Sequence, residues 1–374
     1  MVKVLFVFGT RPEAIKLCPV VRHMQSRATE FSARVCVTAQ HRGLLDQVLE
    51  IFGVKPDHDL DIMQPGQTLS QSTARIIAAL EPVMQREKPD MVLVQGDTTS
   101  TFCGALSAFY HHVPVGHIEA GLRTWDLRQP FPEEANRVLT GRLTDLHFAA
   151  TEWSAANLRK EGVAAESILV TGNTGIDAVL QVARELEAGR LDPFTAAPLH
   201  SGKKLIVVTS HRRESFGGGV QSLCDALAKL AGRGDTQIVF AVHPNPNVRG
   251  PVHERLGDNP NIALVDPVSY VPFVDLMRRS YLLLTDSGGI QEEGPSLGKP
   301  ILVLRDKTER PEAVEAGTVK LVGTDTDRIL TEAGILLDDQ AEYERRAHAH
   351  NPYGDGQASP RIADRLLTWR AALP

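Results

Sequence analysis

Length, composition and charge set the first limits on this chain. Its 374 residues carry a net charge of −6 and 42% hydrophobic residues, an ordinary composition for a globular protein of two domains. The negative charge argues against a general nucleic-acid binder. No apolar stretch approaches the length of a membrane span, so we expect no membrane attachment.

Short β-branched runs alternate with amphipathic segments along the whole chain, which predicts βαβ units and parallel sheets. The runs are almost continuously apolar, as is typical of strands covered on both faces. The predicted strands are Val2–Phe8, Ala33–Thr38, Met91–Gln95, Val115–Ile118, Leu146–Ala149, Ile168–Val170, Lys204–Thr209, Gln237–Val242, Ile262–Val265, Leu282–Thr285, Ile301–Leu304 and Lys320–Val322. Helical patterns lie between them, for example over Gln71–Arg86 and Ser154–Glu161.

A composition change at 177–202 separates two α/β halves, because a charged helix there is followed by glycine and two prolines. We expect an N-terminal Rossmann-like domain over 1–176 and a C-terminal one over 203–358, with a last helix over 359–372 packing back on the first domain. Two such halves would face each other across a central cleft. Ligands of doubly wound sheets bind beyond the carboxyl ends of the strands.

The first strand runs directly into the segment Gly-Thr-Arg-Pro-Glu at 9–13. Gly9 permits a tight turn, and Thr10 with Glu13 predicts a capping box. Arg11 and Lys16 then lie at or near a helix N-terminus, which favours anions. The segment matches neither the dinucleotide fingerprint nor the P-loop. An ordinary capped helix with two surface cations is the alternative interpretation.

Acidic residues follow the predicted strands of the first half. Asp97 comes after Met91–Gln95 and is either a helix cap or a carboxylate aimed at a ligand. Glu119 ends a buried strand, where desolvation requires a partner. Glu133 and Glu134 open a helix, whose dipole explains one of them more readily than both. Three such acidic ends are typical of acid/base chemistry.

The second half offers sites for phosphates. A His-Arg-Arg cluster begins at His211 and is followed by glycines, which suits a pyrophosphate. Ser287, Gly288 and Gly289 place small residues at a helix start, and Glu293 one turn later can accept two ribose hydroxyls. The alternative is a tight turn with a glutamate on the surface.

The cysteines and histidines do not indicate a metal. The four cysteines are scattered without a C-x-x-C pair, and the 13 histidines include no H-E-x-x-H spacing. We therefore expect no metal site. Apolar neighbours around most of the cysteines predict buried thiols, which fits a reducing cytoplasm.

Several motifs together resemble the non-hydrolysing UDP-N-acetylglucosamine 2-epimerases, over nearly the full length. The motifs are Phe8-Gly9-Thr10-Arg11-Pro12-Glu13, Thr38-Ala39-Gln40-His41-Arg42, Gln95-Gly96-Asp97-Thr98-Thr99, His117-Ile118-Glu119-Ala120-Gly121-Leu122-Arg123-Thr124, Glu133-Glu134-Ala135-Asn136-Arg137, Ser210–Phe216, Asp286–Glu293 and Asn351-Pro352-Tyr353-Gly354-Asp355-Gly356. The resemblance implies a GT-B-type fold, two doubly wound domains, and a homodimer.

The implied reaction is a reversible inversion at C2 that converts UDP-GlcNAc to UDP-ManNAc without a nicotinamide or other cofactor. UDP leaves by anti elimination, a 2-acetamidoglucal stays bound, and UDP adds back with a proton on the opposite face. ManNAc units for cell-surface polysaccharide are the implied product use.

The resemblance also implies roles for individual residues. Asp97, Glu119 and Glu133 would carry the acid/base work, and His211 would assist near the diphosphate. The implied substrate-binding residues are Arg11, Lys16, Val268, Phe273, Ser287, Gly288, Gly289, Glu293 and Arg310, with Val268 and Phe273 marking the segment that cradles uracil.

Many members bind a second UDP-GlcNAc as an activator, and the matching positions here are Gln40, His41 and His243. This chain departs from several of those members by having Gly43 and Gly66 where they carry a polar and a basic residue.

Three rival functions use the same residues differently. A UDP-sugar-dependent glycosyltransferase of the same fold would use Ser287–Glu293 equally well, but it needs fewer carboxylates. A hydrolysing 2-epimerase would release ManNAc and UDP; this chain lacks the sugar-kinase domain attached to that enzyme. A catalytically silent nucleotide-sugar sensor would not need the candidate acids.

Overall fold

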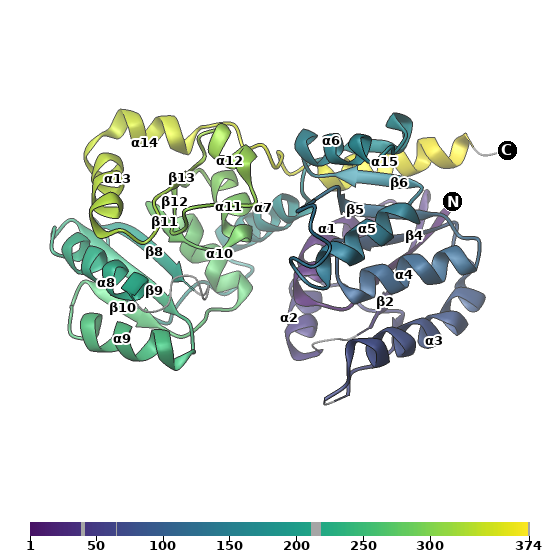
Figure 1. The fold of residues 1–374 in the computed structure, drawn as a ribbon, viewed down its shortest axis with the longest axis horizontal. Helices are drawn as coiled ribbons and strands as arrows, with labels where there is room; N and C mark the ends of the chain where they lie inside the picture. Colours follow the sequence, from purple (N-terminus) through teal and green to yellow (C-terminus); the bar gives the residue numbers. More distant parts are fainter. Residues whose placement is uncertain (39–41, 65, 211–217, 373–374) are drawn as a thin grey trace. The chain divides into compact units, whose positions relative to one another are not determined.

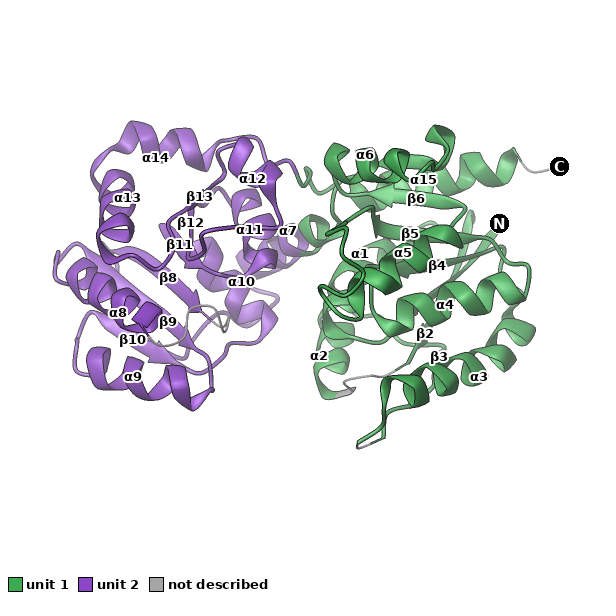
Figure 2. Ribbon diagram, in the orientation of Figure 1, with its two compact units in different colours: residues 1–178, 353–374 green, residues 179–352 purple. Residues whose placement is uncertain are grey.

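The computed structural model describes residues 1–38, 42–64, 66–210 and 218–372. The chain forms two compact units: residues 1–178 with 353–374 make unit 1, and residues 179–352 make unit 2 (Figure 2).

Unit 1 is built on a seven-stranded parallel sheet with the order β3-β2-β1-β4-β5-β6-β7 (Figure 1). The strands are β1 (Val2–Phe8), β2 (Phe31–Val37), β3 (His58–Asp59), β4 (Met91–Gln95), β5 (Val115–Ala120), β6 (Leu146–Ala149) and β7 (Ile168–Val170). The chain winds outward from β1 in one direction and from β4 in the other, so the topological switch point lies between β1 and β4.

Unit 2 repeats this plan with a six-stranded parallel sheet of order β10-β9-β8-β11-β12-β13. The strands are β8 (Lys204–Ser210), β9 (Thr236–Val242), β10 (Ile262–Val265), β11 (Leu282–Thr285), β12 (Ile301–Val303) and β13 (Val319–Leu321). Its switch point lies between β8 and β11. The two doubly wound parallel sheets that the sequence predicts are thereby confirmed.

Helices cover both faces of each sheet. They are α1 (Arg11–Ser26), α2 (Arg42–Phe52), α3 (Leu69–Glu87), α4 (Thr99–Tyr110), α5 (Glu133–Arg142), α6 (Glu152–Lys160), α7 (Thr174–Glu187), α8 (Gly218–Ala231), α9 (Pro246–Leu256), α10 (Tyr270–Arg279), α11 (Gly288–Ser296), α12 (Pro311–Glu315), α13 (Thr326–Asp338), α14 (Gln340–Ala347) and α15 (Ala358–Ala371), with a 3₁₀ turn at Ala165–Ser167.

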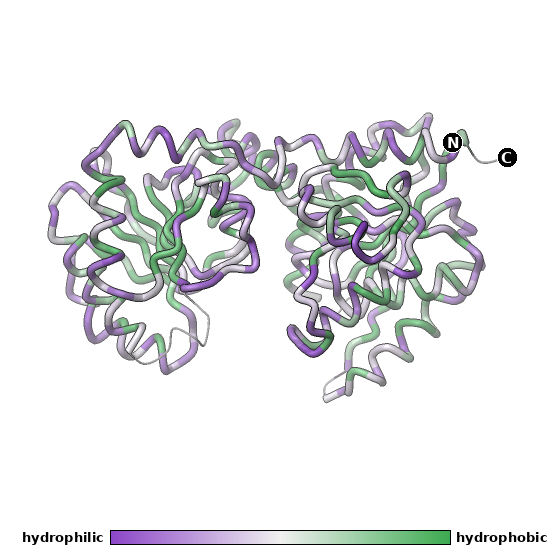
Figure 3. Tube along the Cα trace, turned by 45° about the horizontal axis from the view of Figure 1, so that its top comes forward, coloured by the Kyte–Doolittle hydropathy of each residue, from purple (hydrophilic) through white to green (hydrophobic). Residues whose placement is uncertain are grey.

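Each unit has its own apolar core. In unit 1, α3 and α4 bury side chains such as Ile76 and Cys103 against the strands, and in unit 2 helices α8, α9 and α13 do the same with Leu227 and Val252. Figure 3 shows hydrophobic stretches of the chain within both units. The nearly continuous apolar runs of the sequence are therefore explained by burial on both faces.

The chain passes from unit 1 to unit 2 inside helix α7, between residues 178 and 179, and returns between 352 and 353. The segment 177–202, which the sequence marks as a linker, is divided: Asp177 belongs to unit 1, and 179–202 belongs to unit 2, where the Phe194 N–H donates to Asp275 at 3.0 Å. Helix α15 packs on α1 in unit 1.

Two further expectations concern membranes and thiols. Among the helices of the described residues, none combines the length and the apolar character that crossing a membrane requires. All four cysteines are free and buried, as the sequence predicts.

A pair of buried histidines lies on neighbouring strands of unit 1. His117 on β5 and His147 on β6 are register partners, 1% and 2% exposed. Burial lowers the pKa of His117 to about 3 and that of His147 to about 4, because the cation loses its hydration. His117 Nε2 pairs with the Gly96 carbonyl at 2.7 Å, so the neutral ring supports the loop after β4.

These two pKa values predict an acid-labile fold. Below pH ~6.5 the unfolded chain protonates both histidines while the folded chain does not, so the free energy of unfolding falls as the pH drops. We expect H117Q to reduce that slope by about 1.4 kcal/mol per pH unit between pH 6 and 4.5. Urea denaturation at several pH values measures it. H253Q, at an exposed site of α9, is the control; an equal slope in wild type and H117Q would contradict the prediction.

Candidate active site

The candidate residues of unit 1 gather at the carboxyl ends of the strands around its switch point. Arg11 begins α1 directly after β1, Asp97 follows β4, and Glu119 lies near the end of β5. Since parallel strands end at one edge of the sheet, adjacent order in the sheet brings these residues together. The Gly96 N–H donates to the Ile118 carbonyl at 3.0 Å, which joins the loop after β4 to strand β5.

Glu13 links the turn after β1 to the loop after β4. One oxygen of this buried carboxylate accepts the backbone N–H groups of Gly9 and Thr10 at 3.0 and 2.7 Å. The other lies 2.7 Å from the Thr98 hydroxyl and 3.1 Å from that of Thr101. The expected capping box is thus present, and it does more than cap a helix. Burial raises the pKa of Glu13, although these hydrogen bonds oppose the shift.

Asp97 is held by helix α5. Arg137 donates to its carboxylate at 2.5 Å, and Asn136 donates from its side-chain amide to the Asp97 carbonyl at 3.0 Å. The guanidinium of Arg137 also reaches Glu134 at 3.1 Å. Asp97 is therefore fixed by both its side chain and its backbone. The capping role weighed for it goes instead to Thr98, whose hydroxyl accepts the Thr101 N–H.

Glu133 and Glu134 have different surroundings. Glu134 is 1% exposed and accepts the backbone N–H groups of Thr124 and Trp125 at 2.9 and 3.1 Å. Trp125 has a φ of 66°, so this carboxylate holds a strained loop in place. Glu133 is half-buried and makes no side-chain hydrogen bond or ion pair within the described part of the chain. Glu134 is thus explained by structure, and Glu133 is left available for chemistry.

Glu119 is surrounded by donors from three other elements. Lys16 of α1 forms an ion pair with it, and Gln95 at the end of β4 donates its amide to the other oxygen. Asn173, just before α7, donates at 3.2 Å. Glu119 itself has a φ of 62°, in the left-handed region that non-glycine residues rarely adopt.

The two cations at the start of unit 1 also differ. Lys16 lies against Glu119, so its ammonium is engaged with a carboxylate in this structure. Arg11 is half-buried at the N-terminus of α1, and its guanidinium makes no hydrogen bond or ion pair with the residues described. Arg11 therefore offers the charge that an anion at this helix end would use.

In unit 2, Ser287, Gly288 and Gly289 lie at the start of α11, beside the switch point. Arg310 lies over this helix end, because a Cβ added to Gly288 would come 2.3 Å from its Nη1. The buried Glu292 accepts from Arg310 Nε at 2.6 Å and holds the guanidinium there. A positive side chain thus joins the N–H groups of a helix start, an arrangement that favours phosphate.

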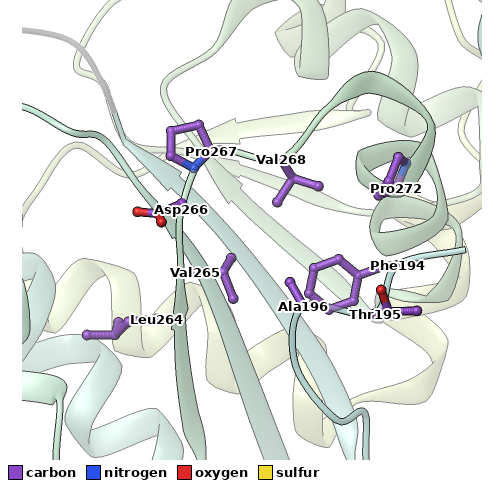
Figure 4. Close-up of a pocket in the computed structure, with 9 residues that line it drawn as sticks. All are labelled: Phe194, Thr195, Ala196, Leu264, Val265, Asp266, Pro267, Val268 and Pro272. Atoms are coloured by element: carbon purple, nitrogen blue, oxygen red, sulfur yellow. The ribbon is translucent and has the colours of Figure 1, made fainter.

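A cavity of about 430 Å³ lies at the carboxyl end of β10. Figure 4 shows Val265 and Val268 facing Phe194 and Ala196 across it. Val268, one of the two residues expected near uracil, lines this cavity. Phe273 is half-buried on α10 and is not among the lining residues.

Several predicted positions fall elsewhere. His211, Gln40 and His41 lie outside the described residues. His243 follows β9 and accepts the Asn245 N–H through Nδ1 at 3.2 Å. Glu293 is half-buried on α11, next to the glutamate that holds Arg310. Within the ranges that the structure describes, no group of three or more His, Cys, Asp or Glu side chains could hold a metal ion.

Known proteins share both the sequence and the fold. A family model described as UDP-N-acetylglucosamine 2-epimerase matches residues 23–367. The UDP-N-acetylglucosamine 2-epimerase of Escherichia coli K12 is 56% identical over 99% of this chain and 100% of its own length. The chain belongs to the UDP-N-acetylglucosamine 2-epimerase family.

Solved structures of this epimerase family agree. The Neisseria meningitidis UDP-GlcNAc 2-epimerase, bound to UDP-GlcNAc, is 49% identical with a TM-score of 0.86, covering 98% of this chain and 100% of its own. The Methanocaldococcus jannaschii enzyme, in complex with UDP-GlcNAc and UDP, is 32% identical with a TM-score of 0.75, covering 98% and 99%. The resemblance of the sequence motifs to UDP-N-acetylglucosamine 2-epimerases is confirmed.

Sequence reasoning misses the residues that hold the candidate acids and Arg310. Gln95, Asn173 and Arg137 contact candidate acids, and Glu292 contacts Arg310, but the sequence alone assigns no role to them. Gln95 carried a usable signal, since a polar residue ending an apolar strand needs a partner. For Asn173 the only signal is its position before a helix, and an ordinary N-cap explains an asparagine there equally well.

The contrast between the two adjacent glutamates gives a stability prediction. E134A leaves two backbone N–H groups and Nη1 of Arg137 without their acceptor, so we expect it to lower the free energy of unfolding by about 2–4 kcal/mol. E133A is the matched control, with an expected change within about 0.5 kcal/mol. Urea denaturation measures both. Equal stability of the two variants would show that Glu134 does not hold the loop.

Proposed function

We propose that this chain is a non-hydrolysing epimerase that interconverts UDP-GlcNAc and UDP-ManNAc at C2. We further propose that it works in the cytoplasm as a homodimer and supplies ManNAc units for cell-surface polysaccharide. The free, buried cysteines agree with a reducing compartment. The ligands in the Neisseria and Methanocaldococcus structures support UDP-GlcNAc as substrate and UDP as the leaving group.

The observation that carries this proposal is the set of carboxylates in unit 1. Asp97 and Glu119 end adjacent strands and are fixed by different donors, and Glu133 opens the helix that holds Asp97. Inversion at a carbon needs one group to remove a proton from one face and another to deliver it to the other. A transferase needs at most one base, so this set favours the epimerase.

The proposed chemistry balances without a redox partner. A carboxylate removes the C2 proton, and the electron pair of the C2–H bond forms the C1–C2 double bond of 2-acetamidoglucal. At the same time the C1–O bond breaks, and its electron pair leaves on the UDP oxygen. The UDP oxygen then attacks C1 again, while a second group protonates C2 from the opposite face. His211 would assist near the diphosphate.

Positive groups support the departure of UDP. Arg310 lies over the N-terminus of α11 in unit 2, and Arg11 lies at the N-terminus of α1 in unit 1. Charge that develops on the leaving diphosphate is stabilised by fixed cations and backbone N–H groups. Glu293 would bind the ribose, and the segment from Val268 to Phe273 would hold the uracil.

Proton NMR in deuterated water tests the proposal directly. With UDP-GlcNAc and no cofactor, we expect UDP-ManNAc to appear and deuterium to enter C2 of both nucleotide sugars. Accumulation of free ManNAc and UDP would identify a hydrolysing enzyme instead. An unchanged spectrum, with UDP binding confirmed by calorimetry, would favour a glycosyltransferase. The active preparation is expected to sediment at twice the chain mass.

Substitution of the candidate acids tests their roles in the same assay. We expect D97N and E119Q each to lower the rate by at least about 10²-fold, because general acid/base catalysis contributes that much or more. Both variants should fold and bind UDP, since they keep the size of the side chain. A variant with a near-normal rate would remove that residue from the mechanism.

Gly288 tests the phosphate site of unit 2. In G288A the added Cβ would displace the Arg310 guanidinium, so we expect the Kd for UDP to rise about tenfold, or ~1.4 kcal/mol. G334A is the matched control, because Gly334 lies on α13 with open space around the added Cβ. Calorimetry measures both. Unchanged affinity in G288A would mean that Arg310 does not contact UDP.

A further inference from the structure

Glu119 needs outside support to keep its orientation. A φ of 62° costs a non-glycine residue about 1 kcal/mol or more, and the register of β5 against β6 shifts at this point. The side chain therefore leaves the strand along an unusual direction. Lys16 of α1 forms an ion pair with Glu119, and two amides, from Gln95 and Asn173, also donate to its carboxylate.

The amide of Asn173 can be oriented from its hydrogen bonds. Its Oδ1 accepts the Gly175 N–H at 2.8 Å, at the start of α7. The opposite end is then the NH₂ group, which lies 3.2 Å from Glu119 Oε1 and donates to it. Asn173 is 3% exposed, so water does not compete for these partners.

The backbone of Asn173 is tied to the point where the chain re-enters unit 1. Its N–H donates to the Tyr353 carbonyl at 2.7 Å, one residue after the return crossing. Gly172 beside it approaches the same segment closely, because an added Cβ would lie 3.3 Å from Gly354 Cα. Five residues after Asn173 comes the outgoing crossing within α7. Asn173 is therefore hydrogen-bonded inside unit 1 both to the start of α7, which leads to the outgoing crossing, and to the segment that follows the return crossing.

We propose that Asn173 is a positioning residue for Glu119, which it connects to the joined crossing segments of the chain. The inference rests on the proposed function, because it takes Glu119 to be an acid/base group. One amide joins three parts: the Glu119 carboxylate, the start of α7 and the segment at Tyr353. A change of conformation at either crossing would then shift Asn173 and, through its hydrogen bond, the Glu119 carboxylate.

N173D is the decisive variant. An aspartate still accepts the Gly175 N–H, so the start of α7 is kept, but it replaces the donor to Glu119 with a second carboxylate. We expect kcat to fall about 100-fold, as misplacement of a reacting group does, with the Kd for UDP changed less than threefold. One limb of the pH profile of kcat should also move to higher pH, because two adjacent carboxylates retain a proton.

N173S and N261D separate positioning from folding. Serine at 173 can accept the Gly175 N–H but is too short to reach Glu119, so kcat should fall without a shifted limb. N261D makes the same isosteric change in unit 2, where Asn261 donates to the Ala231 carbonyl, and should leave kcat and its pH profile unchanged. Circular dichroism checks the fold of each variant; if N173D does not fold, N173S alone decides by its kcat.

The outcomes distinguish this inference from the proposed function. Normal kcat in folded N173D and N173S, together with an inactive E119Q, would overturn the role of Asn173 alone. An active E119Q would overturn the role of Glu119 in the proposed function. A rise in the Kd for UDP in N173D that equals the loss in kcat/KM would show a role in binding or folding, and would also overturn positioning.

Discussion

The buried carboxylate of Glu13 is the constraint on which the candidate site of unit 1 depends. It accepts two N–H groups from the turn after β1, and its second oxygen contacts two hydroxyls from the loop after β4. Burial alone would make such a carboxyl costly, and it raises the pKa of Glu13. The contacts offset that cost only while both loops keep their places. Arg11 and Asp97, which these loops carry, are therefore positioned by one group that does not itself need to touch a ligand.

The three candidate acids are made different by their neighbours rather than by their type. Asp97 faces an arginine, Glu119 faces a lysine and two amides, and Glu133 has no side-chain partner among the described residues. Carboxylates in different environments can take different parts in one reaction. Glu134 has a structural role instead, because its carboxylate accepts backbone N–H groups. Glu133 and Glu134 are adjacent in the sequence, and only the fold determines that Glu134 is the structural one.

The sequence predicts the sheets well and the site only in part. Apolar β-branched runs mark each observed strand except β3, which has two residues, His58 and Asp59, and no apolar run to reveal it. The sequence does not reveal the unit boundary within α7, because a helix can continue from one unit into the next without a change in its hydrophobic pattern. The contact of Asn173 with Glu119 joins residues 54 positions apart. No local pattern encodes such a contact, since it exists only after β4, β5 and the start of α7 come together.

The two units use a buried glutamate near a helix start in opposite ways. In unit 1, Glu13 occupies the first N–H groups before α1 and leaves Arg11 without a partner in the described part of the chain. In unit 2, Glu292 takes the arginine, Arg310, and holds it over Gly288 at the start of α11. One solution offers an arginine on a capped helix end; the other offers a helix end with an arginine already fixed above it. Both arrangements place a cation beside a helix start, where free N–H groups and the helix dipole already favour an anion. The same physical solution is thus reached in each unit with a different pairing of glutamate and arginine.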